Sequence, residues 1–200
     1  MVGAKKNSKH DPEKRKARVF AAALGLFSER KFYGTTMQMI ANEAGVAAGT
    51  IYRFYESKDL LFNDLFKHWN KRFCEALFMD FPSHLGAREQ FHALCDRLCN
   101  FAKEHPKPFL FIEEHHHGPY MDDASLKTLA EVTDGIISWA KAWQKKKVIK
   151  NLDQVALLSI VYGGYTTLLK EFEAGKVELT PALLKNVEDC FWAAVAIPKT

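Results

Sequence analysis

Hydrophobic residues recur every three or four positions over most of this 200-residue chain. Such spacing gathers apolar side chains on one face of an α-helix. A first stripe consists of Phe20, Leu24 and Phe27. Two longer stripes follow, at Leu61, Leu65, Trp69, Phe73 and Leu77 and at Leu126, Leu129, Ile136, Ala140 and Trp143. Runs that alternate strictly between apolar and polar residues are hard to find, so a β-sheet is not expected.

Capping residues, glycines and prolines divide these stripes into elements. Asp11-Pro12 predicts the start of a helix that ends near Arg30, because proline suits the first helical position. Ser57 caps a long helix that ends near Met79. The remaining predicted helices lie near 37–44, 48–54, 87–104, 105–118, 123–147, 153–174 and 181–196. The pattern therefore predicts an all-α chain of about nine helices.

Composition and charge narrow the class of protein. Residues 1–72 contain 14 Lys and Arg against 7 Asp and Glu, whereas residues 73–200 carry a net charge of −3. A basic first part is typical of a surface that meets a polyanion, although a solvated lysine-rich tail explains the charge equally well. Residues 1–10 are expected to be a disordered basic tail.

Several other classes of protein are disfavoured. No apolar run approaches the roughly 20 residues that a membrane-spanning helix needs, and no secretory signal is recognised. The four cysteines do not form a disulfide framework, which favours a reducing, cytoplasmic location. No nucleophile with a nearby base and no phosphate-binding glycine loop is found, so an enzyme is not expected.

The segment from Thr36 to Tyr55 has the pattern of a helix-turn-helix motif. Its first helix has Ile40 facing inward and small residues where a second helix can cross. Gly45 occupies the turn, where a glycine adopts positive φ without steric cost. Ile51 and Phe54 are expected to anchor the second helix. A tight helical corner without a nucleic-acid role would share this pattern, and the basic charge favours the DNA-binding interpretation.

The side chains on the other face of the second helix suit a DNA groove. Ala48 and Gly49 let the helix N-terminus approach a groove wall, where the helix dipole favours phosphate. Thr50 offers a hydroxyl group to phosphate or base and a methyl group to thymine. Tyr52 can reach a phosphate or stack on a sugar, and Lys58 lies in the first turn of the next helix, in reach of a backbone phosphate.

Residues from about 14 to 66 resemble the DNA-binding domain of the TetR family of bacterial regulators. The resemblance extends over nearly all of the segment LGLFSERKFYGTTMQMIANEAGVAAGTIYRFYESKDLLF. The matching positions are Phe27, Thr35, Thr36, Ile40, Ala41, Ala44, Gly45, Val46, Gly49, Thr50, Tyr52, Phe54, Lys58 and Leu61. The resemblance implies that a double-stranded DNA operator is contacted by Thr36, Gln38, Ala48, Thr50, Tyr52 and Lys58.

The chain departs from the family pattern at two positions. Lys31 stands where the family often ends its first helix with glycine, so the chain there must adopt a left-handed conformation at some cost or end the helix differently. Ala47 stands where the family often has a serine or threonine cap, and losing that cap costs about 1 kcal/mol of local helix stability.

The resemblance also implies how the rest of the chain is organised. It predicts an N-terminal three-helix helix-turn-helix domain over 11–57 and a helical-bundle domain for ligand binding and dimerisation over 58–200. The helices near 153–174 and 181–196 would form a bundle with a second copy, because one reading head covers only half of a palindromic site. The alternative is that both helices bury their apolar faces within one subunit. Gly163-Gly164 would permit a close helix approach in either arrangement.

The expected function is a ligand-released repressor that binds a palindromic operator as a homodimer. Its effector would be a small apolar or aromatic molecule, with no cofactor and no metal. The candidate ligand-binding residues are Phe109, His116, Tyr120, Trp139, Trp143 and Tyr162.

Two alternatives remain beside that function. One is a helical enzyme or small-molecule-binding protein that uses the run His115 to His117, although adjacent imidazoles on a helix point about 100° apart and cannot all face one ion. A polar helix end with one buried, hydrogen-bonded histidine is the preferred interpretation of that run. The other alternative is a protein-interaction module, which the positive charge of residues 1–72 disfavours.

Overall fold

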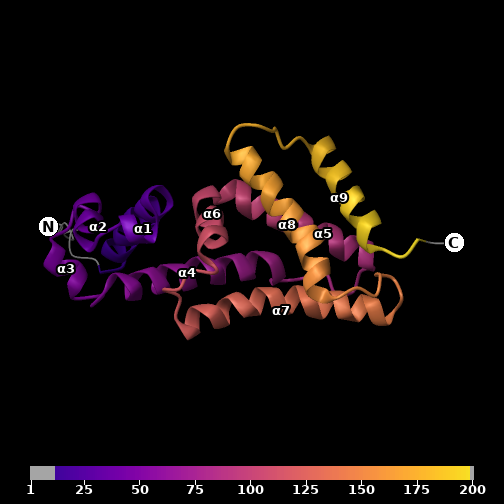
Figure 1. Cartoon of the computed structure of the whole chain (residues 1–200), viewed down its shortest axis with the longest axis horizontal. Helices are drawn as coiled ribbons and strands as arrows, with labels where there is room; N and C mark the ends of the chain where they lie inside the picture. The colour runs from indigo at the N-terminus through magenta and orange to yellow at the C-terminus, as the bar shows by residue number, and fades with distance from the viewer. Residues whose placement is uncertain (1–11, 199–200) are drawn as a thin grey trace, which may run out of the picture. The chain divides into compact units, whose positions relative to one another are not determined.

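The computed structural model describes residues 12–198, and within them the chain is all-α (Figure 1). The basic tail predicted for residues 1–10 and the Asp11 cap lie outside the described residues. The nine helices of the described range are α1 Pro12–Gly34, α2 Met37–Glu43, α3 Ala48–Tyr52, α4 Lys58–Phe78, α5 Ala87–Glu104, α6 Pro106–His115, α7 Asp123–Lys145, α8 Gln154–Glu173 and α9 Pro181–Val195.

The helices predicted from the hydrophobic pattern are confirmed, with ends that differ by a few residues. Thr36 caps α2 by accepting a hydrogen bond from the Met39 amide at 3.2 Å, and Ser57 accepts one from the Leu60 amide at 3.2 Å. The β-structure between residues 12 and 198 is limited to an isolated antiparallel bridge between Ile149 and Ala196. None of the helices in that range combines the length and the apolar character that a membrane crossing requires.

The chain divides into two compact units, residues 1–66 and 67–200. The division falls inside α4, so the domain boundary after residue 57 stays a prediction. Unit 1 is centred on an aromatic cluster in which Phe62 meets Phe27 and Phe32 edge to face, with ring centroids 5.1 and 5.3 Å apart. Such edge-to-face pairs stabilise beyond the area that they bury, and they hold α1 against α4.

Lys31 interrupts α1 near its end, as the departure from the family pattern led us to expect. Its backbone has φ 59° and ψ 177°, a conformation that glycine adopts freely and other residues adopt only at a cost of about 1–3 kcal/mol. The Thr35 side chain stabilises the bend: its single hydroxyl hydrogen is shared between the Lys31 carbonyl at 2.9 Å and the Leu26 carbonyl at 3.1 Å. The helix therefore bends at this position before α2 begins.

Buried polar side chains connect the helices of unit 2. Gln90 on α5 accepts hydrogen bonds from the indole N–H groups of Trp139 and Trp143 on α7, at 2.9 and 3.2 Å. Its own amide donates to the carbonyls of Ser83 and Leu85, at 3.0 and 2.8 Å. One side chain thus ties α5 to α7 and to the loop that precedes α5.

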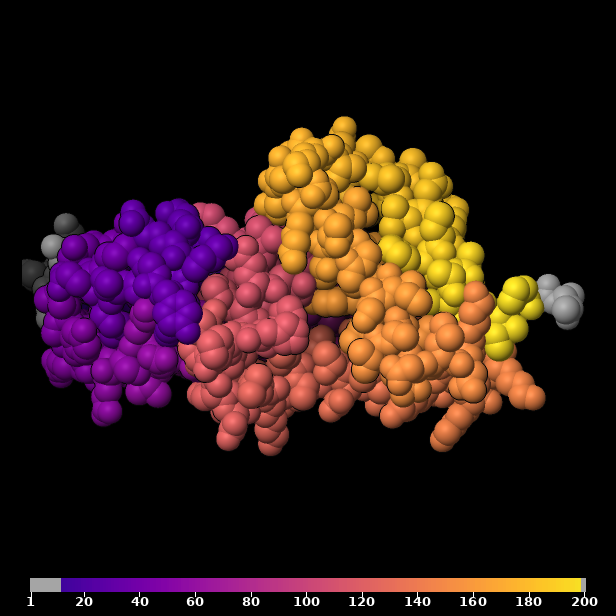
Figure 2. All heavy atoms as spheres, viewed as in Figure 1, coloured from indigo at the N-terminus to yellow at the C-terminus, as the bar shows by residue number. Residues whose placement is uncertain are grey.

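The two C-terminal helices pack on each other through a glycine. A methyl group at Gly164 of α8 would lie 2.2 Å from the Phe191 ring of α9, so only glycine lets that ring lie against the helix backbone. Gly163, its neighbour, faces open space. The close approach at Gly164 therefore joins α8 and α9 of the same subunit. Atoms of both helices also lie at the surface of unit 2 (Figure 2, orange and yellow).

The end of α9 is fastened to the loop that follows α7. The Lys150 amide donates to the Val195 carbonyl at 2.8 Å, and the Ile197 amide donates to the Val148 carbonyl at 2.9 Å. The Lys150 ammonium group also donates to the Ala194 carbonyl at 2.7 Å. The C-terminal end of α9 is therefore held at several backbone positions.

Candidate nucleic-acid interface and ligand cavity

The α2–α3 corner has the geometry that a helix-turn-helix motif needs. Gly45 adopts φ +62°, the left-handed conformation that the sequence predicts for the turn. The Val46 amide donates to the Ala41 carbonyl at 3.0 Å and closes the turn. Ile40 and Ile51 are buried, which fixes both helices against the core of unit 1. The corner is therefore held by a backbone hydrogen bond across the turn and by one buried isoleucine on each helix.

The outer face of α3 carries the side chains that the sequence places there. Gly49 is exposed, and the Tyr52 side chain is 52% exposed. Ala48 and Thr50 are half-buried on the same short helix. Ala47 precedes the helix and makes no side-chain cap, so backbone N–H groups at the α3 N-terminus depend on another acceptor.

The prediction that Phe54 anchors the second helix is wrong, because its side chain is 53% exposed. α3 ends at Tyr52 and Arg53 caps it, so Phe54 lies past the helix, where the chain turns. The inward position belongs to Tyr55, whose hydroxyl donates to the Asp64 carboxylate at 2.6 Å. Burial raises the pKa of Tyr55, and the bond to Asp64 raises it further.

Three of the predicted DNA-contacting side chains already have partners within unit 1. The Lys58 ammonium group donates to the carbonyls of Phe32 and Thr35, at 2.7 and 2.9 Å. Gln38 is exposed and donates to Asn42 at 2.9 Å, and the Thr36 hydroxyl accepts from the α2 backbone. Lys58 therefore joins the end of α1 to the start of α4, a structural role that the sequence did not reveal.

Unit 2 contains a partly open apolar cavity of about 70 Å³. Its wall is built mainly by α5, α7 and α8, together with Leu77, Ile149 and Val195. Aliphatic and aromatic side chains make up most of the wall. Such a cavity is the part of the fold suited to a small apolar ligand.

The six predicted ligand-binding residues separate into two groups. Trp139 and Tyr162 line the cavity. The other four lie elsewhere: Phe109 is packed against Phe73, with ring centroids 6.4 Å apart, and Trp143 is hydrogen-bonded to Gln90. The remaining two, His116 and Tyr120, lie at the C-terminal end of α6 and in the turn after it.

The three adjacent histidines end α6 in different surroundings. His115 is buried, and its Nδ1 atom is hydrogen-bonded to the Tyr120 hydroxyl. His116 is half-buried, and its Nδ1 atom lies 2.8 Å from the Glu113 carbonyl oxygen. Within residues 12–198, no group of three or more His, Cys, Asp and Glu side chains is arranged to hold a metal ion. The arrangement matches the interpretation of a polar helix end with one buried, hydrogen-bonded histidine.

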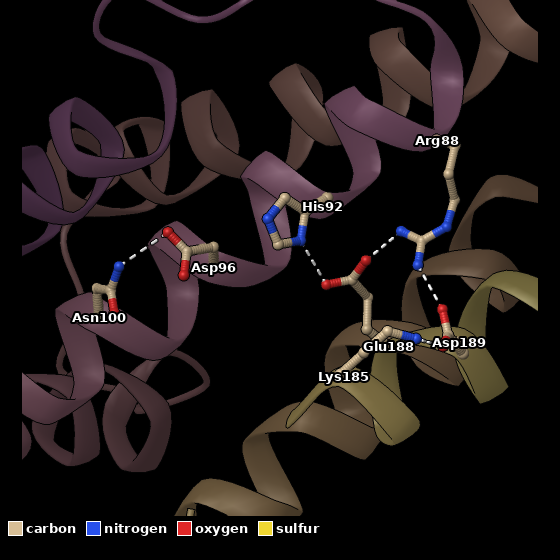
Figure 3. Close-up of polar contacts among 7 residues, drawn as sticks. All are labelled: Arg88, His92, Asp96, Asn100, Lys185, Glu188 and Asp189. Atoms are coloured by element: carbon tan, nitrogen blue, oxygen red, sulfur yellow. Dashed lines mark hydrogen bonds and ion pairs between the residues drawn. The ribbon is translucent and has the colours of Figure 1, made fainter. Parts of the chain in front are cut away.

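A charged cluster between α5 and α9 was not anticipated from the sequence (Figure 3). Arg88 pairs with Glu188 and lies 2.6 Å from the Asp189 carboxylate. The second Glu188 oxygen lies 2.7 Å from His92 Nδ1. Glu188 is buried. The sequence held one signal of this cluster, because a glutamate on the apolar stripe of a helix needs a polar partner when it is buried.

A second buried carboxylate belongs to Glu113 on α6. It accepts a hydrogen bond from the hydroxyl of Tyr162, one of two tyrosines of α8 that line the cavity. Burial raises the pKa of Tyr162 well above its ordinary value, and the charge of Glu113 raises it further. The tyrosine therefore stays protonated, and its single O–H bond is directed to the carboxylate.

The chain is similar to known regulators over nearly its whole length. Residues 19–65 match a family model described as "Bacterial regulatory proteins, tetR family", and residues 66–197 match one described as "Tetracyclin repressor-like, C-terminal domain". The HTH-type transcriptional regulator YhgD of Bacillus subtilis (strain 168) is 26% identical over 80% of this chain and 84% of its own length.

Solved structures share the fold at low identity. A tetR family transcription regulator from Shewanella sp. PV-4 is 22% identical, with a TM-score of 0.79 over 92% of this chain and 99% of that one. A TetR-family transcriptional regulator from Haemophilus influenzae Rd is 21% identical, with a TM-score of 0.77 over 94% of this chain and 100% of that one. Both likenesses establish that the nine-helix fold is shared.

Proposed function

Because this chain belongs to the TetR family of transcriptional regulators and is not an enzyme, we propose that it is a repressor that binds a palindromic operator as a homodimer. A small apolar or aromatic molecule in the cavity of unit 2 releases it from DNA. Because the operator is part of the bacterial DNA, the protein would act in the cytoplasm. The proposal depends on one observation: Ile51 holds one side of α3 in the core, and the opposite side of the helix is exposed to solvent.

The proposed DNA contacts are divided between the two helices of the corner. Thr50 and Tyr52 on α3 reach bases and sugars, and Ala48 lets the helix approach closely. Thr36 and Gln38, at the start of α2, bind the DNA backbone on the other side of the groove. The Lys58 ammonium group has three N–H bonds, of which two are donated to carbonyls, and the third reaches a phosphate. Together these residues set the register of the reading head.

Selection of bound sequences from a random pool of duplexes tests the DNA-binding proposal. We expect enrichment of a palindrome whose half-sites lie about one helical turn apart, or a multiple of it. Fluorescence anisotropy should then show preference for that palindrome over random DNA and an affinity that falls steeply with salt. A protein that binds every duplex equally well contradicts the proposal.

The exposed surface of α8 and α9 supports the proposed homodimer. Val155 and Ile160 on α8 are 64% and 41% exposed, and Ile197 beyond the end of α9 is 42% exposed. Gly163 on α8 faces open space and can accept a close neighbour. A second copy would remove this apolar surface from water, which is favourable at about 25 cal/mol per Å².

Light scattering after gel filtration tests the dimer. The double substitution Val155→Asp and Ile160→Asp should convert the dimer to a monomer, because it buries two charges in the proposed interface. Leu126→Asp on α7 is the matched control, since Leu126 is 44% exposed but lies outside α8 and α9. Loss of the dimer in the control alone would place the interface elsewhere.

The proposed release mechanism requires the cavity to change size. Pockets for drug-sized ligands measure about 300–1,000 Å³, whereas this cavity measures about 70 Å³. A bound effector therefore has to move the helices that line it, and the liganded protein differs in shape from this one. In the proposed dimer, that difference changes the spacing of the two reading heads, so that they no longer fit successive major grooves.

A further inference from the structure

The surface of the unit 2 cavity is almost wholly apolar, and its wall carries no positive charge. Among the lining residues, the side chains with a polar atom are Cys95, Trp139, Gln154, Tyr162 and Tyr165. None of these side chains is cationic at any pH. An anion in the cavity would therefore lose its hydration without gaining a counter-ion, which is costly in an apolar environment.

A nearby arginine is already neutralised. The Arg88 guanidinium lies 5.9 Å from the ring centroid of Phe91, which lines the cavity. Its N–H groups donate to Glu188 and Asp189 on α9 (Figure 3). Asp189 also binds Lys185 at 2.7 Å, so positive and negative charges balance within the cluster. Arg88 therefore has no uncompensated charge to offer to a ligand.

The Tyr162 hydroxyl presents an acceptor and not a donor. It has one hydrogen, and that hydrogen is donated to the Glu113 carboxylate. Any ligand group that reaches the hydroxyl oxygen must therefore donate a hydrogen bond to it. The negative charge of Glu113 lies behind the tyrosine and strengthens this preference, because it polarises the O–H bond and makes the oxygen a better acceptor.

Three ionisable groups of the wall report the same environment. Burial raises the pKa of Cys95 to about 12. Burial also raises the pKa of Tyr165 above its ordinary value, and that of Tyr162 is raised by burial and by Glu113. Each residue is thus held in its neutral, protonated form. A ligand carboxylate placed among them meets the same penalty.

The geometry points to an effector that is uncharged and apolar, in which any polar group that meets the Tyr162 hydroxyl is a hydrogen-bond donor such as an alcohol or phenol hydroxyl group. This inference rests on the effector-binding part of the function proposed above and names the class of molecule. A cationic ligand is a poorer fit than a neutral one, because Glu113 does not line the cavity and its carboxylate is already bound by Tyr162. Removing an ammonium group from water without a direct partner is costly.

Three molecules with one eight-carbon body and different head groups test the inference. The probes are 1-octanol, octanoate and octylammonium, titrated at pH 7.5 into the full-length protein without DNA. Binding is followed by tryptophan fluorescence, since Trp139 lies in the cavity wall. We expect 1-octanol to bind at least about tenfold more tightly than either ion. Equal or tighter binding of octanoate or octylammonium, or no binding of 1-octanol, overturns the inference.

The pH dependence of octanoate binding provides a second measurement on the unmodified protein. A carboxylic acid with an ordinary pKa of roughly 4–5 is protonated in only a small fraction at pH 7.5. If the cavity accepts only the neutral acid, octanoate affinity rises about tenfold for each unit by which the pH is lowered between 7.5 and 6. The affinity of 1-octanol should not change over that range. An octanoate affinity that stays constant contradicts the inference.

A pair of substitutions on α6 isolates the contribution of Glu113. Glu113→Gln removes the charge behind Tyr162 and keeps an acceptor for its hydroxyl, so the preference for 1-octanol over octanoate should fall several-fold. The matched control is Glu114→Gln on the adjacent, exposed residue, which should leave the preference unchanged. A ratio that is the same in both variants, with their helicity intact by circular dichroism, overturns the role of Glu113.

The location of the ligand is tested by filling the cavity. Ala140→Leu adds volume at a buried lining position and should weaken 1-octanol binding by tenfold or more. Unchanged affinity would place the ligand elsewhere and overturn the inference. These titrations contain no DNA, so failure to select an operator sinks the repressor proposal alone, whereas failure of the probes to discriminate sinks the effector class alone.

Discussion

Two polar side chains of the α2–α3 face, Thr36 and Gln38, lie in solvent, whereas Gln90 and Glu188 in unit 2 are buried and hold several partners each. Thr36 and Gln38 hydrogen-bond within their own helix and stay exposed. Gln90 and Glu188 are buried and join different helices. The difference teaches that unit 1 keeps polar groups where an incoming molecule can use them, whereas unit 2 uses its own to fix a scaffold around an apolar interior.

The largest effect is expected from Gln90→Leu, which breaks the scaffold of unit 2. The substitution leaves the indole N–H groups of Trp139 and Trp143 without their acceptor and two loop carbonyls without their donor. We expect a loss of about 3–4 kcal/mol in the free energy of unfolding, measured with urea. Gln38→Leu on the exposed face of α2 is the control and should cost less than about 0.5 kcal/mol.

Arg88→Met should produce the next largest effect. It leaves the buried Glu188 carboxylate with His92 as its remaining side-chain partner, and an uncompensated buried charge is costly. We expect a loss of about 2–3 kcal/mol in stability. Lys185→Met removes an exposed partner of Asp189 and should be nearly neutral in the same denaturation experiment. Equal costs for the two variants would mean that burial of Glu188 adds nothing.

Tyr52→Ala sharpens the comparison from the side of unit 1. Its side chain is half exposed, so its removal should leave the melting temperature unchanged. On the selected operator, anisotropy should show affinity reduced by roughly 10–30-fold, the loss of about 1.5–2 kcal/mol expected for a contact with DNA. Tyr33→Ala is the control, because Tyr33 is an exposed tyrosine outside the predicted contacts, and this variant should bind the operator normally. Parallel losses in both variants would contradict a specific role for Tyr52.

The smallest effect is a gain from Lys31→Gly. Glycine adopts the positive φ of this position without strain, although its freedom in the unfolded chain offsets part of the benefit. We expect a net stabilisation of about 1 kcal/mol, seen as a melting temperature a few degrees higher, with operator affinity unchanged. Lys31→Ala separates the two causes, because alanine removes the side chain and keeps the strain. A gain with alanine equal to that with glycine would rule out backbone strain.

Local pattern was sufficient to predict the helices and the corner of unit 1. Gly45, Thr36 and Ser57 act within a few residues of their own position, so a single sequence reveals their roles. Phe54 was misjudged because α3 ends at Tyr52, and helix length is not fixed by the spacing of two apolar residues.

Partners distant along the chain could not be predicted. Arg88 and Glu188 are 100 residues apart, and Tyr162 meets Glu113 over 49 residues. Periodicity says which face of a helix is apolar, but it does not say which helix covers that face. For the same reason, the aromatic residues of unit 2 could be counted as cavity candidates, yet only Trp139 and Tyr162 among those predicted line the cavity.

The fastening of α9 at Lys150 has a mechanical consequence for the cavity. Ile149 and Val195 both line the cavity, and backbone hydrogen bonds next to these residues hold the end of α9 to the loop after α7. If the cavity expands to admit a ligand, this hydrogen-bonded end of α9 should act as a pivot. The displacement of α9 should then increase toward Pro181. Amide hydrogen exchange along α9 would then be slowest near Val195, and loading with guest would accelerate it most in the first turn.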